Sequence, residues 1–407
     1  MSSLNLAAAM VVGLFAAPAD SAPVAAETQI RRWIQDAMER HPEGQSAGFQ
    51  TQAARSEIGA ATGWMPPETQ LLYKSDKSVD LSMTQMIPGF GKTGSQTKIR
   101  EAKLDMARSD SADRMRKLAL AIRETAWMEW MALEKCRILV QQESLAIRLS
   151  ESVRRAQSQG MATASEAWLA QAKARQIRLE SEKAKSEAAA ATAMREAWAG
   201  PGTTIVASAP SSPDWTDSVV AVSAATRSDI ASMEREASMQ VAMAESMRAS
   251  LHPDYMVVAM VMRMSNGMPG WGVMAGLTLP FVPWASGMAS GEAAGAHSRS
   301  RSTRSKVESM RKMAYAEVVD HSNKANTAWH AMRELDSLIL PGQENAIADA
   351  RSRYAQGREM LSMVFAMQDM ALMTRMERLM RRGEYELERA RLLAAAGLES
   401  FEQAGAR

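Results

Sequence analysis

The sequence has few of the residues that form disulfides, metal sites or catalytic centres. Cys136 is the one cysteine among 407 residues, which excludes a disulfide within the chain and any multi-cysteine metal site. The five histidines are scattered without H-E-x-x-H or similar spacing, which favours independent surface or packing roles. G-x-S-x-G motifs, metal triads and paired His–carboxylate spacings are missing too. The sequence therefore predicts a protein that is not an enzyme and needs no cofactor.

The net charge and the hydropathy pattern further narrow the classes of protein to which this sequence can belong. A formal net charge of +2 argues against a dedicated nucleic-acid surface. The apolar run at residues 4–17 is too short for a membrane-spanning helix, and later windows hold no long uncharged apolar stretch. Val24-Ala25-Ala26 resembles a small-residue cleavage site. We therefore expect residues 1–26 to be a signal peptide of an exported protein without a transmembrane helix.

Long helices are the main prediction for the rest of the chain. Residues 96–157 contain neither proline nor glycine and are rich in helix-forming residues, which corresponds to roughly 90 Å of helix. An imperfect heptad series, interrupted by Ser111 and Thr125, runs along it at Leu104, Leu118, Ala132, Leu139, Ala146 and Val153. Further helices are expected over residues 30–63, 163–198, 226–249 and 289–340, with an interruption at Pro341-Gly342, and from 358 to 396.

The segment QMIPGFGKTGS, residues 85–95, looks like a phosphate-binding loop but lacks its first glycine. The motif G-x-x-x-x-G-K-[ST] requires glycine where Met86 stands, and Pro88 has no N–H to donate to a phosphate. A turn between a strand and a helix is the favoured interpretation.

The two halves of the sequence repeat one order of elements. Each has a short helix, a strand pair, a long helix, a tight turn at a glycine and a medium helix. Gly160 ends the first long helix and Gly357 the second. We expect a first repeat at 27–200, a linker at 201–225, a second repeat at 226–397 and a tail at 398–407.

At this level the sequence resembles the outer-membrane factor family, the TolC-type channels of tripartite efflux pumps. The resemblance covers about residues 30–397. It rests on the duplicated layout, the HPE at His41-Pro42-Glu43, the turns AQSQG and RYAQGR, and the closing LERARLLAAAGLE. QMIPGFGKTG resembles the turn typical of the heavy-metal branch, which exports copper, silver, cobalt, zinc or cadmium.

The resemblance implies a mainly α fold with a small β part. Long antiparallel helical hairpins and four strands per protomer would form a trimeric α-barrel/β-barrel channel. The strands would lie in the outer membrane and the helices in the periplasm. The implied partners are two further copies of the chain, a periplasmic adaptor (membrane fusion protein), an inner-membrane pump and outer-membrane lipid, with no nucleic acid.

The resemblance also assigns candidate site residues. The two helix–turn–helix tips would gate the channel and dock the adaptor through Gln157, Gln159, Gly160, Arg353, Tyr354, Gln356, Gly357 and Arg358. In this interpretation Arg353 and Tyr354 bond to a neighbouring protomer; the alternative is helix capping beside a solvated charge. The strand–helix turns would be formed by Pro88, Gly89, Gly91, Lys92 and Pro280.

Alternation of side chains assigns faces to the strands. In VDLSMTQMI the apolar Val79, Leu81, Met83 and Ile87 alternate with Asp80, Ser82 and Thr84, which we expect to face water in the lumen. In DYMVVAMVMRM one face carries Met256, Met260, Met262 and Met264. These methionines are either a soft-metal path for Cu(I) or Ag(I) or flexible apolar filler. Arg263 on the other face, if that face meets water, favours filler.

The predicted function is an outer-membrane channel that exports heavy-metal cations. The alternatives are a drug, organic-solute or type I secretion channel of the same fold, or a periplasmic coiled-coil adaptor protein. An adaptor needs one helical hairpin flanked by β-rich lipoyl halves, whereas this sequence has a duplicated hairpin–strand unit.

Overall fold

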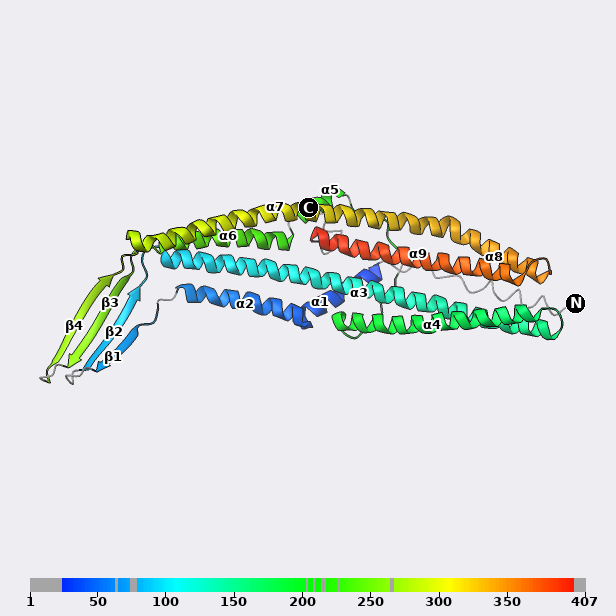
Figure 1. Cartoon of the computed structure of the whole chain (residues 1–407), viewed down its shortest axis with the longest axis horizontal. Helices are drawn as coiled ribbons and strands as arrows, with labels where there is room; N and C mark the ends of the chain where they lie inside the picture. Colours follow the sequence, from blue (N-terminus) through cyan, green and yellow to red (C-terminus); the bar gives the residue numbers. More distant parts are fainter. Residues whose placement is uncertain are drawn as a thin grey trace. The chain divides into compact units, whose positions relative to one another are not determined.

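The computed structural model describes residues 24–62, 65–73, 79–202, 204–207, 209–213, 215, 217–225, 227–263 and 267–398. The helices and strands follow the duplicated order expected from the sequence (Figure 1). The first half contains α1 (Val24–Arg40), α2 (Pro42–Thr62), β1 (Glu68–Tyr73), β2 (Val79–Ile87), α3 (Lys92–Ser158) and α4 (Ala164–Ala199). The second contains α5 (Asp217–Ala224), α6 (Ser228–Ala249), β3 (Tyr255–Arg263), β4 (Pro269–Leu277), α7 (Pro283–Glu334), η1 (Leu335–Ile339), α8 (Leu340–Ala355) and α9 (Leu361–Ala396).

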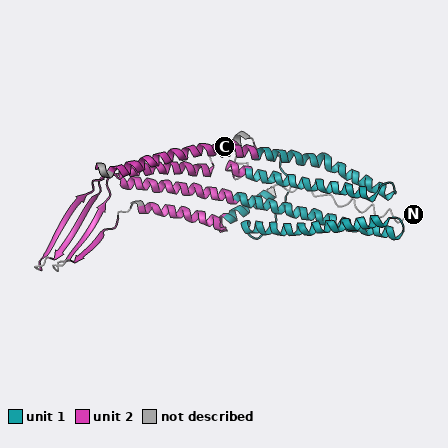
Figure 2. Cartoon of the chain, in the orientation of Figure 1, with its two compact units in different colours: residues 1–37, 119–214, 321–391 teal, residues 38–118, 215–320, 392–407 magenta. Residues whose placement is uncertain are grey.

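The chain divides into two compact units, and each draws on both halves of the sequence (Figure 2). Unit 1 comprises residues 1–37, 119–214 and 321–391, and unit 2 comprises residues 38–118, 215–320 and 392–407.

Unit 2 contains the sheet, in which the four strands pair antiparallel in the order β1-β2-β3-β4. β2 and β3 join the two repeats, with Val79 opposite Arg263 at one end and Ile87 opposite Tyr255 at the other. The helices of this unit pack through small residues, for example Ala244 of α6 against Ala293 and Ala296 of α7. Small residues at such a contact let the helix axes approach closely.

Five residues of the expected heptad series are buried, and Ala132 is half-buried. Leu104 and Leu118 are buried in unit 2, and Leu139, Ala146 and Val153 are buried in unit 1. Thr125, which interrupts the series, is also buried and returns its hydroxyl to the carbonyl of Ala121 at 2.8 Å. The interruption therefore leaves no buried hydroxyl without a hydrogen-bond partner.

Unit 1 contains a buried ion pair that fixes the end of α4. Arg195 and Glu129 are at most 1% exposed and lie 3.1 Å apart, Nε to Oε2. Arg195 also donates to the carbonyl oxygens of Gly200 and Gly202, at 2.7 and 3.0 Å, and stacks over Trp33. These added partners matter because a buried ion pair stabilises a fold only when its remaining donors are satisfied.

Three expected elements differ in the structure. The helix expected at residues 30–63 is broken at His41, because Pro42 lacks an N–H and begins α2 while the His41 ring accepts from the Glu43 N–H at 3.2 Å. The expected linker contains α5, which buries Val220. At Pro341-Gly342, where an interruption was expected, the chain stays helical. The π-helical turn η1 precedes the proline and accommodates the backbone hydrogen bond that Pro341 cannot donate.

Candidate functional site

The segment QMIPGFGKTG connects β2 to α3 and is held by a carboxylate from the second repeat. The Gly89 N–H donates to Oδ1 of Asp254 at 2.8 Å, and Nζ of Lys92 lies 2.7 Å from Oδ2. Burial pushes the pKa of Asp254 upward, but the hydrogen bonds and charge of Lys92 and Gly89 outweigh it and lower the pKa below its ordinary value. Lys92 thus has an internal partner, as a structural turn requires.

Close backbone packing explains the glycine of this turn. A Cβ on Gly89 would lie 2.0 Å from the carbonyl oxygen of Pro253, so no other residue fits without moving the backbone. Nδ1 of His252 lies 2.7 Å from the carbonyl oxygen of Phe90. The turn after β2 therefore interlocks with the segment that enters β3.

The expected turn residues occupy the expected places, but their main partner was not foreseen. Pro88, Gly89, Gly91 and Lys92 follow β2, and Pro280 lies between β4 and α7. Asp254 was missed because a lone aspartate before a strand carries no signal in one sequence. The available hint was the Pro253-Asp254 pair, which stands directly before the first strand of the second repeat.

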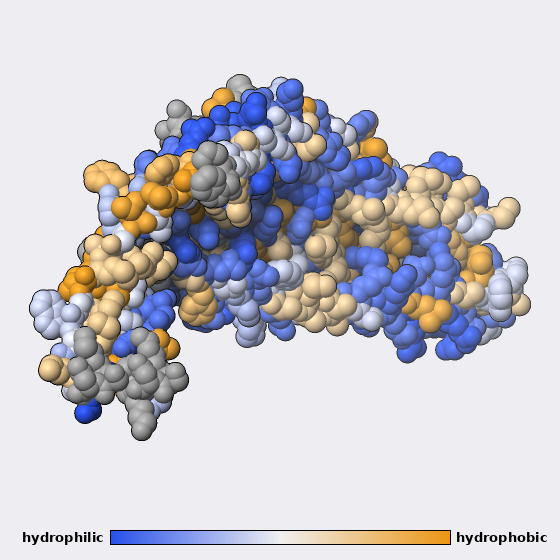
Figure 3. All heavy atoms as spheres, turned by 60° about the vertical axis from the view of Figure 1, so that its left-hand side comes forward, coloured by the Kyte–Doolittle hydropathy of each residue, from blue (hydrophilic) through white to orange (hydrophobic). Residues whose placement is uncertain are grey.

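Apolar side chains gather on one face of the sheet. Leu81, Val261 and Trp271 lie directly opposite one another and therefore share a face. Apolar residues colour the strands at the left of Figure 3, and the large exposed side chains of this face are Leu71, Tyr73, Leu81, Met83, Tyr255, Val257, Val261, Trp271, Val273 and Leu277. A protein surrounded by water rarely exposes so continuous an apolar surface, so this face fits an apolar environment.

The polar strand residues lie on the opposite face. Asp80, Ser82 and Thr84 pair with Met262, Met260 and Val258 of β3. The methionines therefore share the face of the polar residues, and the expectation that this face lines the lumen stays a prediction.

The register places Arg263 on the face opposite to that of Asp80, against the expectation that the face of Arg263 meets water. Arg263 lies opposite Val79, on the apolar face. If Asp80 faces water, the methionine face meets that water and the Arg263 face does not. The pairing register between β2 and β3, which come from different repeats, decides which face Arg263 shares with the residues of β2. Alternation within one strand does not give that information.

The methionines of β3 lie over glycines of β4. Met256, Met260 and Met262 pair with Gly276, Gly272 and Gly270. Sδ of Met260 is 3.7 Å from where a Cβ on Gly272 would stand, and Cε of Met256 is 3.1 Å from the equivalent position on Gly276. The glycines leave room for the thioethers.

The register adds one methionine to this face and leaves another aside. Met86 of β2 lies opposite Met256, an addition the sequence did not indicate. Met264 lies outside the described residues.

Two matching turns form the helix tips of unit 1. In the first, the Met161 N–H donates to Ala156 and the Gly160 N–H to Gln157, at 2.9 and 3.0 Å. In the second, the Arg358 N–H donates to Arg353 and the Gly357 N–H to Tyr354, both at 2.9 Å. Both turns are therefore Schellman motifs, with φ of +72° at Gly160 and +70° at Gly357.

The four helices that meet at these tips share one small core. Val153 of α3, Ala170 of α4 and two residues of α9, Leu361 and Phe365, pack together. Tyr354 of α8 packs against this core. Its burial and the nearby carboxylate of Glu166 raise the pKa of its hydroxyl.

The remaining predicted tip residues are exposed. Gln157, Gln159, Gln356 and Arg358 face solvent in the protomer. Arg353 is also exposed, and its guanidinium lies 2.8 Å from Asp349 one turn earlier in α8. Within one protomer Arg353 and Tyr354 therefore differ: one is a surface charge with a local partner, and the other is anchored in the tip core.

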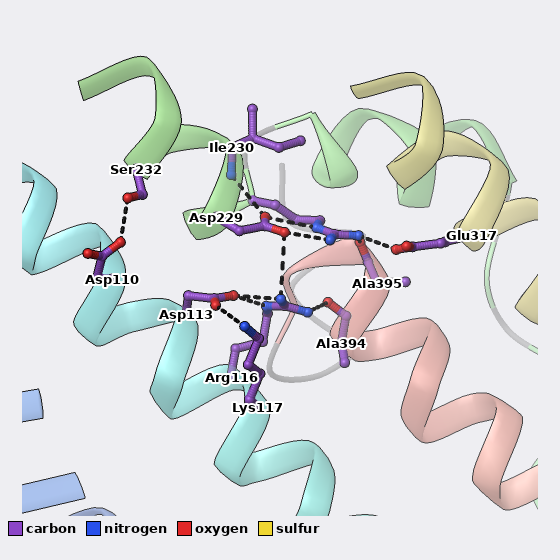
Figure 4. Close-up of polar contacts among 11 residues, drawn as sticks. Asp110, Asp113, Arg116, Lys117, Asp229, Ile230, Ser232, Glu317, Ala394 and Ala395 are labelled. Carbon is purple, nitrogen blue, oxygen red and sulfur yellow. Dashed lines mark hydrogen bonds and ion pairs between the residues drawn. The ribbon is translucent and has the colours of Figure 1, made fainter. Parts of the chain in front are cut away.

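The last turn of α9 is a second place where the two repeats meet, through polar contacts that the sequence did not indicate (Figure 4). Arg116 of α3 donates to the carbonyl oxygen of Ala394 at 2.8 Å, and Arg227, just before α6, donates to that of Ala395 at 3.4 Å. Carbonyls in the last helical turn have no partner within the helix. The Gly397 N–H donates to Ala394 at 3.1 Å, and the two arginines add further donors. The motif LERARLLAAAGLE thus ends a helix that two arginines cap.

Acidic partners keep Arg227 in place. It donates to Asp229 at 2.6 Å and to Glu317 of α7 at 2.5 Å (Figure 4). Burial pushes the pKa of Arg227 downward, but the bonds to these carboxylates outweigh it and raise the pKa above its ordinary value. For Asp229 burial pushes the pKa upward, and Arg227 more than reverses this, so the pKa falls. Arg227 and Asp229 therefore stay charged near neutral pH.

The described residues contain neither a membrane-spanning helix nor a metal-binding cluster. No helix in that part of the chain has an apolar stretch long enough to cross a membrane. No group of three or more His, Cys, Asp or Glu side chains in the same residues is arranged to hold a metal ion.

Known structures share this architecture, although no family model and no curated protein matches the sequence. A membrane protein from Pseudomonas aeruginosa is similar at a TM-score of 0.77 and 16% identity, over 91% of this chain and 90% of that chain. CusC, studied for folding and transmembrane channel formation, is similar at 0.76 and 14%, over 94% and 96%. The CmeC outer membrane channel of Campylobacter jejuni is similar at 0.75 and 12%, over 90% and 85%. The chain therefore has the fold of TolC-like channel proteins, long helical hairpins with a small four-stranded antiparallel sheet.

Proposed function

We propose that this chain is the outer-membrane channel of a tripartite efflux pump and works as a homotrimer. The observation that carries the proposal is the sheet, which has an exposed apolar face, a polar face and two edges. β1 and β4 each pair on one side within the described chain. Unpaired strand edges are strongly unfavourable in lipid, so a sheet placed there needs further strands. Three copies, joined edge to edge, satisfy every strand.

The helices fit a conduit on the periplasmic side. The tip turns would form the periplasmic mouth and receive a periplasmic adaptor, which in turn contacts an inner-membrane pump. Support comes from the matched geometry of the two turns and from the exposed side chains of Gln157, Gln159, Gln356 and Arg358. Two equivalent turns per protomer would give the mouth six similar docking positions with approximate sixfold repetition.

Assembly and conduction test the proposal directly. Three chains of 44.4 kDa should give a particle of about 130 kDa in light scattering corrected for detergent. The same particles should insert into planar bilayers and conduct ions. A stable monomer with intact strands, or trimers that never conduct, would contradict the proposal.

Heavy-metal cations are the proposed cargo within this function. The support for this cargo is the Pro88-Gly89-Lys92 turn, which resembles that of the metal branch. A deletion strain should become sensitive to metal ions and keep its tolerance of hydrophobic drugs. The reverse pattern would favour the alternative, a drug or organic-solute channel of the same fold.

A further inference from the structure

A groove of about 880 Å³ runs between α6 and α7 in unit 2. The two helices are held together beside it by specific contacts. The Ser300 hydroxyl donates to the carbonyl oxygen of Ala237 at 3.0 Å, and Arg299 Nε donates to Gln240 Oε1 at 3.2 Å. The groove is thus a built feature of the helix pair, and its volume lies in the range of small-molecule sites.

Positive charge lines this groove without an internal counterion. Arg248 of α6 and two residues of α7, Arg301 and Arg304, line it, and the lining contains no Asp or Glu. In the part of the chain that the structure describes, no hydrogen bond or ion pair engages the guanidinium groups of Arg248, Arg301 and Arg304. The groove therefore presents three unpaired cations to a ligand.

Other arginines of α7 show that pairing is available on this helix. Arg299 bonds to Gln240, and Arg311 pairs with Glu234 of α6. Arg301 and Arg304 lie three residues apart and so project from neighbouring positions on one side of the helix. Two adjacent guanidinium groups suit a phosphate, which accepts several charge-assisted hydrogen bonds.

Apolar residues also line the groove. They are Val241, Leu251, Ala293 and Ala294, and three serines, Ser290, Ser298 and Ser300, complete the lining with His297. A bare phosphate would leave this surface uncovered, whereas an amphiphile covers it with its apolar part. Leu251 directly precedes the His252–Asp254 junction with β3, so the groove opens beside the sheet whose apolar face is exposed.

We propose that the α6–α7 groove binds an acidic phospholipid, with its phosphate on the arginines and its acyl chains against the apolar side chains of the lining. That a membrane supplies this lipid rests on the proposed function, whereas the groove and its charges do not. The ligand would stabilise the helices next to the sheet in each protomer.

Native mass spectrometry of the whole protein in a neutral detergent tests the proposal. The probes are dihexanoyl phosphatidylglycerol, dihexanoyl phosphatidylcholine and glycerol phosphate, each titrated below its aggregation threshold. The acidic lipid should bind about tenfold more tightly than the zwitterionic lipid or the bare phosphate, a difference of about 1.4 kcal/mol. The double variant Arg301→Gln, Arg304→Gln should lose at least that factor.

The matched control is Lys306→Gln, Lys312→Gln, which removes the same charge from exposed positions of the same helix outside the groove. It should keep the affinity of the parent. Equal binding of both lipids, equal loss in both double variants, or equal binding of glycerol phosphate would overturn the proposal. Bilayer conductance of the same samples separates the two hypotheses, since normal conductance without lipid binding defeats only the lipid site.

Discussion

Lys92 and Asp254 lie 162 positions apart in sequence, yet the ammonium and a carboxylate oxygen are 2.7 Å apart. The other carboxylate oxygen accepts the Gly89 N–H, so one aspartate at the entrance to β3 holds the chain where it leaves β2. About three quarters or more of each side chain is buried, which shields the pair from water. The pair therefore joins the two repeats at the point where strands give way to helices.

Replacing Asp254 by Asn should destabilise unit 2 by about 1–3 kcal/mol, because a charge-assisted bond is lost and Lys92 keeps an unpaired charge. Urea unfolding followed by tryptophan fluorescence measures this. Lys92→Met combined with Asp254→Asn should be less destabilising than the sum of the single changes. Strict additivity in this cycle would show that the two side chains do not interact.

The same pair predicts a pH dependence. The folded pKa of Asp254 is lowered, so its stabilising contribution is complete above the ordinary aspartate value of about 3.9 and is lost as pH falls through the folded value. The parent should therefore lose stability more steeply than Asp254→Asn in acid. Parallel unfolding midpoints for the two proteins from pH 6 to pH 2.5 would refute this.

The tip glycines predict a local effect on stability. Ala at Gly160 or Gly357 has open space but must adopt positive φ, which costs about 1–2 kcal/mol per residue. Gly48→Ala is the matched control, because Gly48 lies inside α2 with nothing near its Cβ position and should become slightly more stable. Hydrogen exchange at the tips should rise for Gly160→Ala and stay unchanged for Gly48→Ala.

Helix positions and turn glycines were predictable because they depend on local sequence. The heptad series, the alternation in β2 and the breaks at Gly160 and Gly357 each follow from spacing within one segment. The break at His41 was readable as well, since Pro42 disfavours helix for the residue before it. The rest of the segment is rich in helix formers, which favours one continuous helix.

Partners distant in sequence were not predictable. Asp254 beside Lys92, Arg116 beside Ala394 and Met86 beside Met256 depend on how the two repeats meet. One sequence contains no signal for such pairs, because each residue is ordinary in its own segment. The face that Arg263 occupies depends on the same pairing between the two repeats.

The tip residues predict a change in conduction if they close the periplasmic mouth. Replacing Arg353 and Tyr354 by Ala should raise single-channel conductance, because it removes bonds to a neighbouring protomer at the constriction. Asp349→Ala is a useful control, since it frees Arg353 from its partner within α8 without removing the arginine. Unchanged conductance in the double variant would mean that these residues only form the turn.

The methionines of β3 give the prediction that bears on cargo. Changing Met256, Met260, Met262 and Met264 together to Leu keeps apolar bulk and removes sulfur. If these side chains only fill space over the β4 glycines, the variant should fold and restore full metal tolerance to a deletion strain, and this is the outcome we expect.

The competing outcome has its own signature. Because the methionines share a face with Asp80, Ser82 and Thr84, a cation that passes over those polar groups would meet the thioethers. A variant that assembles and conducts normally, yet leaves cells sensitive to Cu(I) or Ag(I) alone, would identify the sulfur ladder as a metal path. Sensitivity to zinc and cobalt as well would instead indicate a general loss of transport, because those harder cations gain little from thioether ligands.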